Sequence, residues 1–204
     1  MLQSSLLVLA MVLLGDWTGP KVKLGTPVID ALLAGDSVAT RLKAMLLPAI
    51  VGGILGGVLL VAFFAFSAPS LPAGFLENGR EFSPPIYTRL LYGGITEEVL
   101  IRYGLMSFFT WVIYRLSQKP GAETGAHCYL LAILLSSILF GVGHLPVASL
   151  LSVELTPALI TYIIIGNSIL GVIAGLLYWR RGLEAAILAH MLAHLVMIAG
   201  EWFM

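Results

Sequence analysis

Residues 44–66 read AMLLPAIVGGILGGVLLVAFFAF, a run without a single charged side chain. A transmembrane helix needs about 20 mostly apolar residues, so this run is long enough to cross a bilayer. It carries two glycine pairs, Gly52-Gly53 and Gly56-Gly57. Small residues at helical spacing let helices approach closely within a membrane. The run therefore predicts a spanning helix that packs tightly against its neighbours.

Apolar stretches on both sides of this run repeat the pattern. A short one at residues 2–15 either forms a short first span or lies partly in the membrane interface. The remaining predicted spans are residues 86–116, 128–143, 157–179 and 183–203. The predicted fold class is an all-α, polytopic transmembrane bundle of about six membrane segments, with a site buried between helices.

The connecting stretches are polar or rich in proline. Within the mixed stretch after the first segment, residues 27–33 predict a short interfacial helix, whereas the proline-rich residues 67–85 predict a loop. Residues 147–156 predict a short connection. We divide the chain into an N-terminal apolar segment with its polar loop, residues 1–43, and a transmembrane core, residues 44–204.

Composition excludes several classes of protein. The chain has 204 residues, of which 59% are hydrophobic and 11% charged, whereas soluble domains carry about 25% charged residues. We therefore predict an integral membrane protein, of the cytoplasmic membrane in a prokaryote or the endoplasmic reticulum in a eukaryote, with the lipid bilayer as its first partner. The net charge of zero gives no reason to expect nucleic acid. The single cysteine, Cys128, excludes an internal disulfide and a multi-cysteine metal site.

Lysines and arginines predict the orientation. The loop after the first segment, the turn near residue 117 and the turn at Arg180-Arg181 carry the strongest basic clusters, and they alternate along the chain. The positive-inside rule places these three loops in the cytoplasm and both termini outside.

The segment Thr96-Glu97-Glu98-Val99-Leu100-Ile101-Arg102 puts three charged side chains into one apolar stretch. Glu98 and Arg102 are four residues apart, so on a helix they are neighbours and can pair. Glu97 is rotated by about 100° and lacks that partner. It is a candidate general acid or base. The alternative is a structural ion pair, with the second glutamate facing water.

Three histidines fall in two other apolar stretches. His144 follows Phe140-Gly141-Val142-Gly143 at the end of one predicted helix, and alone it also suits a hydrogen-bonded interfacial residue. His190 and His194 share one face of the last helix, a spacing that two zinc ligands use. They could instead bond to helix carbonyls. Because buried polar groups in membranes face the bundle interior and pair there, we expect the three helices to form one site.

These motifs, in this order, resemble those of the CPBP family of CAAX prenyl endopeptidases and bacteriocin-processing (Abi) membrane proteins. The motifs are Glu97-Glu98-x-x-x-Arg102, Phe140-x-x-x-His144, and His190 with a polar residue four positions later. The stretch from Gly171 to His190 also resembles the last motif block of the family. The resemblance covers residues 92–195.

The resemblance implies an intramembrane endopeptidase that cleaves a membrane-associated or prenylated protein or peptide. It implies that Glu97 and His144 activate the water, that Glu98 and Arg102 support the site, and that His190 and His194 stabilise the oxyanion. The last position is commonly Asn in the prenyl-protease branch and is His194 here. Glu97, His144, His190 and His194 would also make a zinc set. We favour metal-free activation and keep zinc as the alternative.

Two other function classes stay open. A non-catalytic membrane immunity or regulatory protein of the same fold could use the ion pair and histidines to hold a binding cavity. A proton-coupled transporter could use buried Glu and His as a relay. The exchange Glu97→Gln separates catalysis from binding, because it removes the base and nearly preserves the size of the side chain.

Overall fold

The computed structural model describes residues 2–82, 84–152 and 154–201, and within these ranges it contains helices and no strand. The predicted all-α class is confirmed. The elements, in chain order, are α1 Leu2–Thr18, η1 Gly19–Val22, α2 Pro27–Ala34, α3 Val38–Ser67, η2 Ala68–Ser70, α4 Ala73–Glu81, α5 Ile86–Thr88, η3 Arg89–Glu97, η4 Val99–Met106, α6 Ser107–Ser117, α7 Ala126–Gly143, α8 Leu145–Leu151, α9 Pro157–Arg181 and α10 Leu183–Glu201.

Six helical segments of the described chain are long and apolar enough to cross a membrane, as predicted. α5, η3, η4 and α6 join into one of them, Ile86–Ser117. The first segment reaches Ser4–Val22, because α1 and η1 continue past residue 15. It packs closely on η4, where a methyl group added at Gly104 would lie 2.7 Å from Cβ of Met11. The division of the chain at residue 43 stays a prediction.

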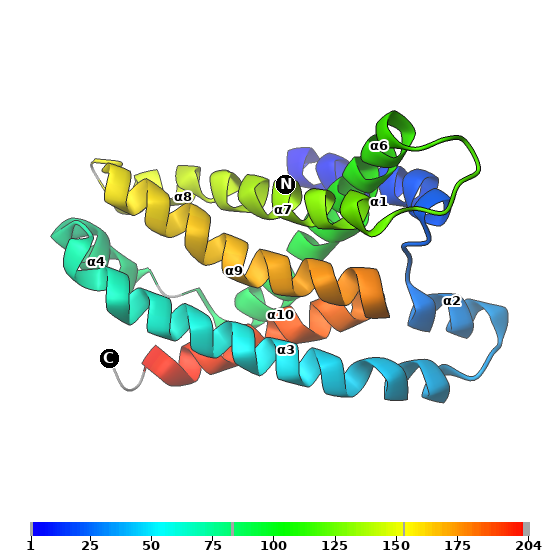
Figure 1. Cartoon of the computed structure of the whole chain (residues 1–204). Helices are drawn as coiled ribbons and strands as arrows, with labels where there is room; N and C mark the ends of the chain where they lie inside the picture. The colour runs from blue at the N-terminus through cyan, green and yellow to red at the C-terminus, as the bar shows by residue number, and fades with distance from the viewer. Residues whose placement is uncertain (1, 83, 153, 202–204) are drawn as a thin grey trace.

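The two glycine pairs of α3 contact two different helices. A methyl group at Gly53 would lie 2.7 Å from the carbonyl oxygen of Ala189, so this face packs against α10. Gly57 continues that face one turn later, whereas Gly52 and Gly56 face side chains of α9. Each face thus repeats every four residues, the spacing that brings residues to one side of a helix. α3, α9 and α10 lie side by side in Figure 1.

The two stretches predicted as plain connections, 67–85 and 147–156, each contain a helix, so that part of the prediction was wrong. α4 begins directly after Pro72, and Pro146 lies in the first turn of α8. Proline is tolerated there because the first turn needs no intrahelical N–H donor. The two short helices support each other, since Asn78 in α4 donates a hydrogen bond to a backbone carbonyl of α8.

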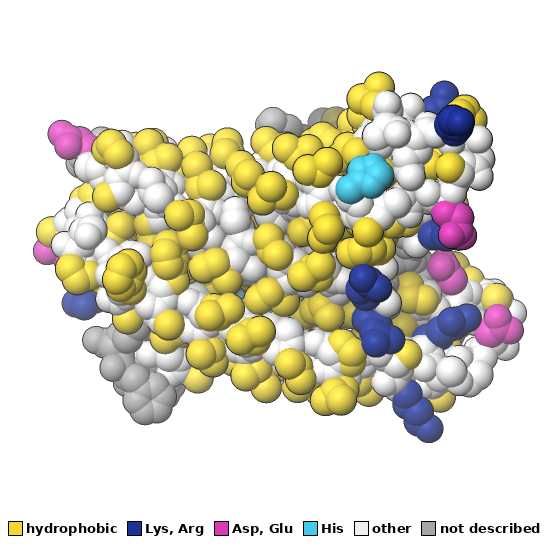
Figure 2. Space-filling view, viewed as in Figure 1, with side chains coloured by type: hydrophobic (Ala, Val, Ile, Leu, Met, Phe, Trp, Pro, Cys, Tyr) yellow, Lys and Arg dark blue, Asp and Glu magenta, His cyan; other side chains and the backbone are white. Residues whose placement is uncertain are grey.

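Charge is divided unevenly between the two ends of the bundle. α4, α8 and the end of α10 lie at one end, and α2 lies at the other (Figure 1). Hydrophobic side chains cover the middle, and basic side chains gather at the α2 end (Figure 2). Eight of the eleven basic residues belong to segments at this end: Lys21, Lys23, Arg41, Lys43, Arg115, Lys119, Arg180 and Arg181. The prediction that this end faces the cytoplasm follows from that count.

Candidate active site

The two glutamates and the arginine lie on the helical segment Ile86–Ser117 (the rod), part of which has an unusual backbone geometry. Its backbone is π-helical over Arg89–Glu97 and Val99–Met106, a form that is rare and often found at functional sites. Oε2 of Glu98 lies 3.4 Å from Nε of Arg102, and both side chains are completely buried. The pair is an ion contact without hydrogen-bond alignment, since neither atom has a hydrogen-bond partner among the described residues.

Arg102 ties the rod to two further helices. Its Nη2 donates a hydrogen bond of 2.9 Å to the carbonyl oxygen of Gly171 in α9. Its guanidinium carbon lies 5.2 Å from the ring centre of Phe140 in α7, within the range of a cation–π contact. A buried charge is tolerated when it is paired and hydrogen-bonded. Arg102 meets that requirement in part, since Nη2 is hydrogen-bonded whereas Nε and Nη1 have no hydrogen-bond partner among the described residues.

His190 of α10 completes the buried part of the site. Its Nδ1–H donates a hydrogen bond of 2.7 Å to Oε1 of Glu98. Its Nε2 lies 3.9 Å from Oε2 of Glu97. The ring therefore lies between the two glutamates, with one nitrogen toward each. We place a proton on Nδ1 because its partner, the Glu98 carboxylate, can only accept a hydrogen bond.

His144 approaches Glu97 from the end of α7. Its Nδ1–H donates a hydrogen bond of 2.9 Å to the carbonyl oxygen of Phe140, and its Nε2 lies 3.7 Å from Oε1 of Glu97. The His144 side chain is 32% exposed and that of Glu97 is 15% exposed. The accessible part of the site is therefore the Glu97–His144 pair, with Glu98, Arg102 and His190 behind it.

His194 lies beside this group, against the ring of His190. Its ring stacks on the His190 ring, with centres 4.9 Å apart and planes at 22°. The Nε2 atom lies against Gly93, where an added methyl group would come within 2.5 Å. All six residues that the sequence singled out therefore come from three helical segments and meet in one region. Their catalytic assignment stays a prediction.

Comparison with known families bears on this arrangement. The family model described as type II CAAX prenyl endopeptidase Rce1-like matches residues 80–196, which is more than half of the chain and includes all six residues. The chain belongs to this family. The resemblance stated from the motifs is thereby confirmed, and membership implies a membrane-embedded protease of the CAAX type. Comparisons with curated proteins and with solved structures found no match.

The predicted zinc set does not fit the observed geometry. A metal ion lies in the plane of the imidazole that binds it, at about 2.0–2.1 Å from nitrogen. The nearly parallel, stacked rings of His190 and His194 do not direct two nitrogens to one such point. Among the described residues, no group of three or more His, Cys, Asp or Glu side chains has the arrangement of a metal site.

Three contributors to this Rce1-like site were not assigned a role from the sequence. Phe140 orients His144 through its carbonyl and lies edge-on to that ring, with centres 4.6 Å apart. Gly171 supplies the acceptor for Arg102, and Gly93 leaves room for the His194 ring. The spacing of Phe140 and His144 was a usable signal, because a residue at i+4 lies over the carbonyl of residue i. The contacts with Gly93 and Gly171 join distant segments and left no such signal.

Proposed function

We propose that this protein is an intramembrane endopeptidase in which Glu97 and His144 activate a water molecule for attack on a peptide bond. The observation that supports this most strongly is the position of the Glu97 carboxylate, which lies 3.7 Å from Nε2 of His144 and 3.9 Å from Nε2 of His190. Both gaps are too long for a direct hydrogen bond. A water about 2.8 Å from each of Glu97 and His144 would fit beside the pair.

His144 takes the role of a hydrogen-bond acceptor in this proposal. Because its Nδ1–H is held by the carbonyl of Phe140, the neutral ring keeps a lone pair on Nε2 that faces Glu97. Glu97 accepts the proton of the attacking water, and His144 orients that water through Nε2. The same carboxyl group can then deliver the proton to the leaving amine, which is the usual sequence of general base and general acid catalysis.

His190 takes the opposite role, that of a donor. In this proposal the ring carries a proton on both nitrogens, because Glu98 accepts the hydrogen bond from Nδ1 and the Glu97 carboxylate lies on the side of Nε2. An Nε2–H of His190 would then point to the side of Glu97 where negative charge develops on the substrate oxygen. Fixed donors of this kind are among the largest contributions to peptide hydrolysis. His194 stacks behind His190 and adds a second N–H donor to the proposal.

The proposal routes no step through a metal, because the stacked rings do not supply a shared ligand point. The substrate class is a membrane-associated or prenylated protein or peptide, in line with the family. His144 lies where α7 meets α8, at the end of the bundle that also holds α4 (Figure 1). A scissile bond would therefore enter from that end.

The test is cleavage by the purified protein in detergent, with prenylated peptides and a library of apolar membrane peptides as substrates. Glu97→Gln should lower kcat by about 10²–10⁴-fold, the contribution of a general base. Glu123→Gln makes the same chemical change in an exposed side chain at the other end and should leave kcat unchanged. Metal content and the effect of a chelator are measured on the same samples.

Two outcomes would redirect the proposal. If the purified protein holds one metal ion per chain and a chelator abolishes cleavage, a metal ion and not Glu97 alone activates the water. Peptide binding without cleavage, equal in the wild type and in Glu97→Gln, would identify a non-catalytic binding or immunity protein of the same fold.

A further inference from the structure

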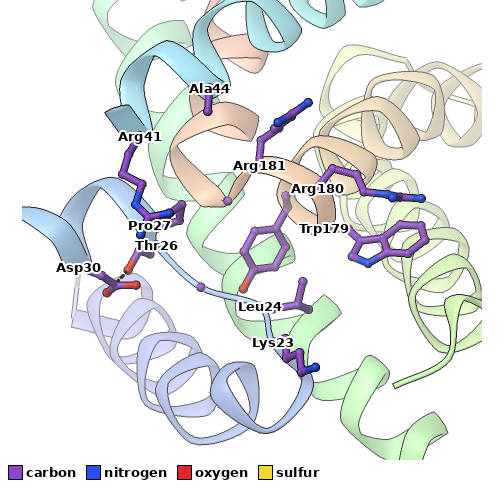
Figure 3. Close-up of a pocket in the computed structure, with 13 residues that line it drawn as sticks. Lys23, Leu24, Thr26, Pro27, Asp30, Arg41, Ala44, Trp179, Arg180 and Arg181 are labelled. Carbon is purple, nitrogen blue, oxygen red and sulfur yellow. Dashed lines mark hydrogen bonds between the residues drawn. The ribbon is translucent and has the colours of Figure 1, made fainter. Parts of the chain in front are cut away.

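A basic cavity lies at the end of the bundle opposite α4 and α8. It has a volume of about 470 Å³ and lies between the α1–α2 connection, the start of α3 and the end of α9 (Figure 3). Ligand pockets commonly have about 300–1,000 Å³. None of the six candidate catalytic residues lines it. The lining residues that matter most are Lys23, Asp30, Arg41, Trp179, Arg180 and Arg181.

The walls of the cavity are fixed by contacts between segments far apart in the chain. Oε1 of Glu184 accepts hydrogen bonds of 2.9 Å from the backbone N–H groups of Val28 and Ile29, which ties α10 to α2. The N–H of Leu183 donates to the carbonyl of Gly25 at 3.1 Å. Gly182 makes the turn from α9 to α10 with a φ of +96° and packs against a proline of α2. The cavity is therefore a built feature of the fold.

The charge of the lining is strongly positive. Four of its side chains are basic and one, Asp30, is acidic, and Asp30 accepts a hydrogen bond from Thr26. Lys23 pairs with Glu123 at 2.9 Å, outside the cavity lining. Within the described residues, Arg41 and Arg181 form no ion pair, and both side chains are exposed. Arg180 forms none either, so three arginines lie at the cavity without an ion-pair partner among the described residues, and Asp30 is the one acidic side chain of the lining.

Aromatic and basic groups also combine here as they do at a membrane interface. The guanidinium carbon of Arg180 lies 4.0 Å from the centre of the Trp179 ring, and Trp179 stacks on Tyr129 at 4.7 Å. Tryptophan and tyrosine are enriched at the level of lipid headgroups. The cavity thus belongs to the interfacial layer, at the end where basic residues gather (Figure 2).

We propose that this cavity binds a phosphate-bearing anion, with the headgroup of an anionic phospholipid as one source and a soluble phosphate compound as the other. Arginine matches phosphate oxygens with two parallel N–H donors. Arg41 reaches the cavity from α3, and Arg180 and Arg181 extend from the end of α9 (Figure 3). Exposed side chains change rotamer within nanoseconds, so these guanidinium groups turn onto a bound anion. Basic pockets between helices on the cytoplasmic side suit anionic headgroups.

The test is native mass spectrometry of the full chain in detergent, titrated with phosphatidylglycerol and, separately, with phosphatidylcholine. Arg41→Gln/Arg181→Gln removes two of the three unpaired charges and keeps Arg180 on the Trp179 ring. The matched control, Arg115→Gln/Lys119→Gln, removes two exposed charges at the same end that do not line the cavity. The cavity variant should bind phosphatidylglycerol about 30-fold more weakly, because each basic group near an anionic surface contributes about 1 kcal/mol. The control should bind as the wild type does.

Inorganic phosphate added as a competitor separates the two sources. Displacement of phosphatidylglycerol by phosphate assigns the cavity to a soluble phosphate compound, and retention assigns it to a lipid headgroup. An equal loss of binding in both double variants would overturn the proposal, since it would indicate general attraction to a basic surface. Equal affinity for phosphatidylcholine and phosphatidylglycerol would overturn it as well. Neither result depends on whether the protein cleaves peptides.

Discussion

Replacing Arg102 tests the buried charge cluster through stability alone, without a substrate. Arg102→Met removes the cation and keeps a long apolar side chain, so Glu98 stays fully buried with only His190 as a partner. Breaking a buried ion pair from one side costs about 3–5 kcal/mol. The carbonyl of Gly171 also loses its hydrogen bond from Arg102, but it lies inside α9 and keeps its intrahelical partner, so this loss adds only about 1 kcal/mol. Because His190 still donates to Glu98, we expect a total loss of about 4 kcal/mol.

The double variant Glu98→Gln/Arg102→Met separates charge from packing. It removes both charges, and the side-chain oxygen of the new amide can still accept from His190. Replacing both members of a buried pair is far less harmful than removing one. We therefore expect the double variant to regain about 2 kcal/mol relative to Arg102→Met. Unfolding is followed by circular dichroism during titration of mixed micelles with a denaturing detergent.

The exposed pair Lys23 and Glu123 serves as the control for this cycle. Its side chains are 71% and 90% exposed, and such pairs contribute little to stability because solvent screens them. Lys23→Met and Glu123→Gln should therefore be additive within error. If Glu98→Gln/Arg102→Met loses as much stability as the sum of its two single variants, Glu98 and Arg102 do not stabilise each other.

Two further predictions concern His194 and the glycine beside it. His194→Asn keeps a side-chain N–H donor and should retain cleavage within about tenfold of the wild type, whereas His194→Leu should lose about 10²–10³ in kcat; equal rates for both variants would remove His194 from the oxyanion site. Gly93→Ala places a methyl group 2.5 Å from Nε2 of His194, so we expect a loss of about 1–3 kcal/mol in stability from overpacking. Gly79→Ala, where nothing lies within 4 Å, should be neutral, and similar melting temperatures for the two alanine variants would contradict the packing argument.

The fold class could be predicted because the bilayer restricts the choice of structure. An uncharged run such as residues 44–66 satisfies its backbone in lipid only as a helix, and its paired glycines indicated close helix contacts. The short helices α4 and α8 could not be predicted in the same way. Their sequences carry prolines, which indicate a turn equally well, and their contacts, such as Asn78 with a carbonyl of α8 and Phe75 with Tyr162 of α9, join distant segments.

The candidate site was predictable as a set of residues and less so as a geometry. Spacing alone indicated that Glu98 and Arg102 meet. Spacing also put His190 and His194 on one face, but it gave no ring orientation, and the orientation decides whether two imidazoles can share a metal ion. Rotamers of this kind depend on what lies opposite, here Gly93 of another helix.

The most informative property of the site is that adjacent residues of one rod have different surroundings. Glu98 points into the bundle, where His190 donates a hydrogen bond to one of its oxygens and Arg102 makes an ion contact with the other. Glu97 is rotated toward the partly exposed side, where its ion-pair contacts among the described residues are with the Nε2 atoms of His144 and His190. A shift of the rod by one residue that moved Glu97 to the place of Glu98 would put Thr96 at the accessible position and leave no carboxylate there. The π-helical backbone on both sides of Glu98 and the contact of Arg102 with Gly171 fix the rod in the register that keeps the two glutamates in these surroundings.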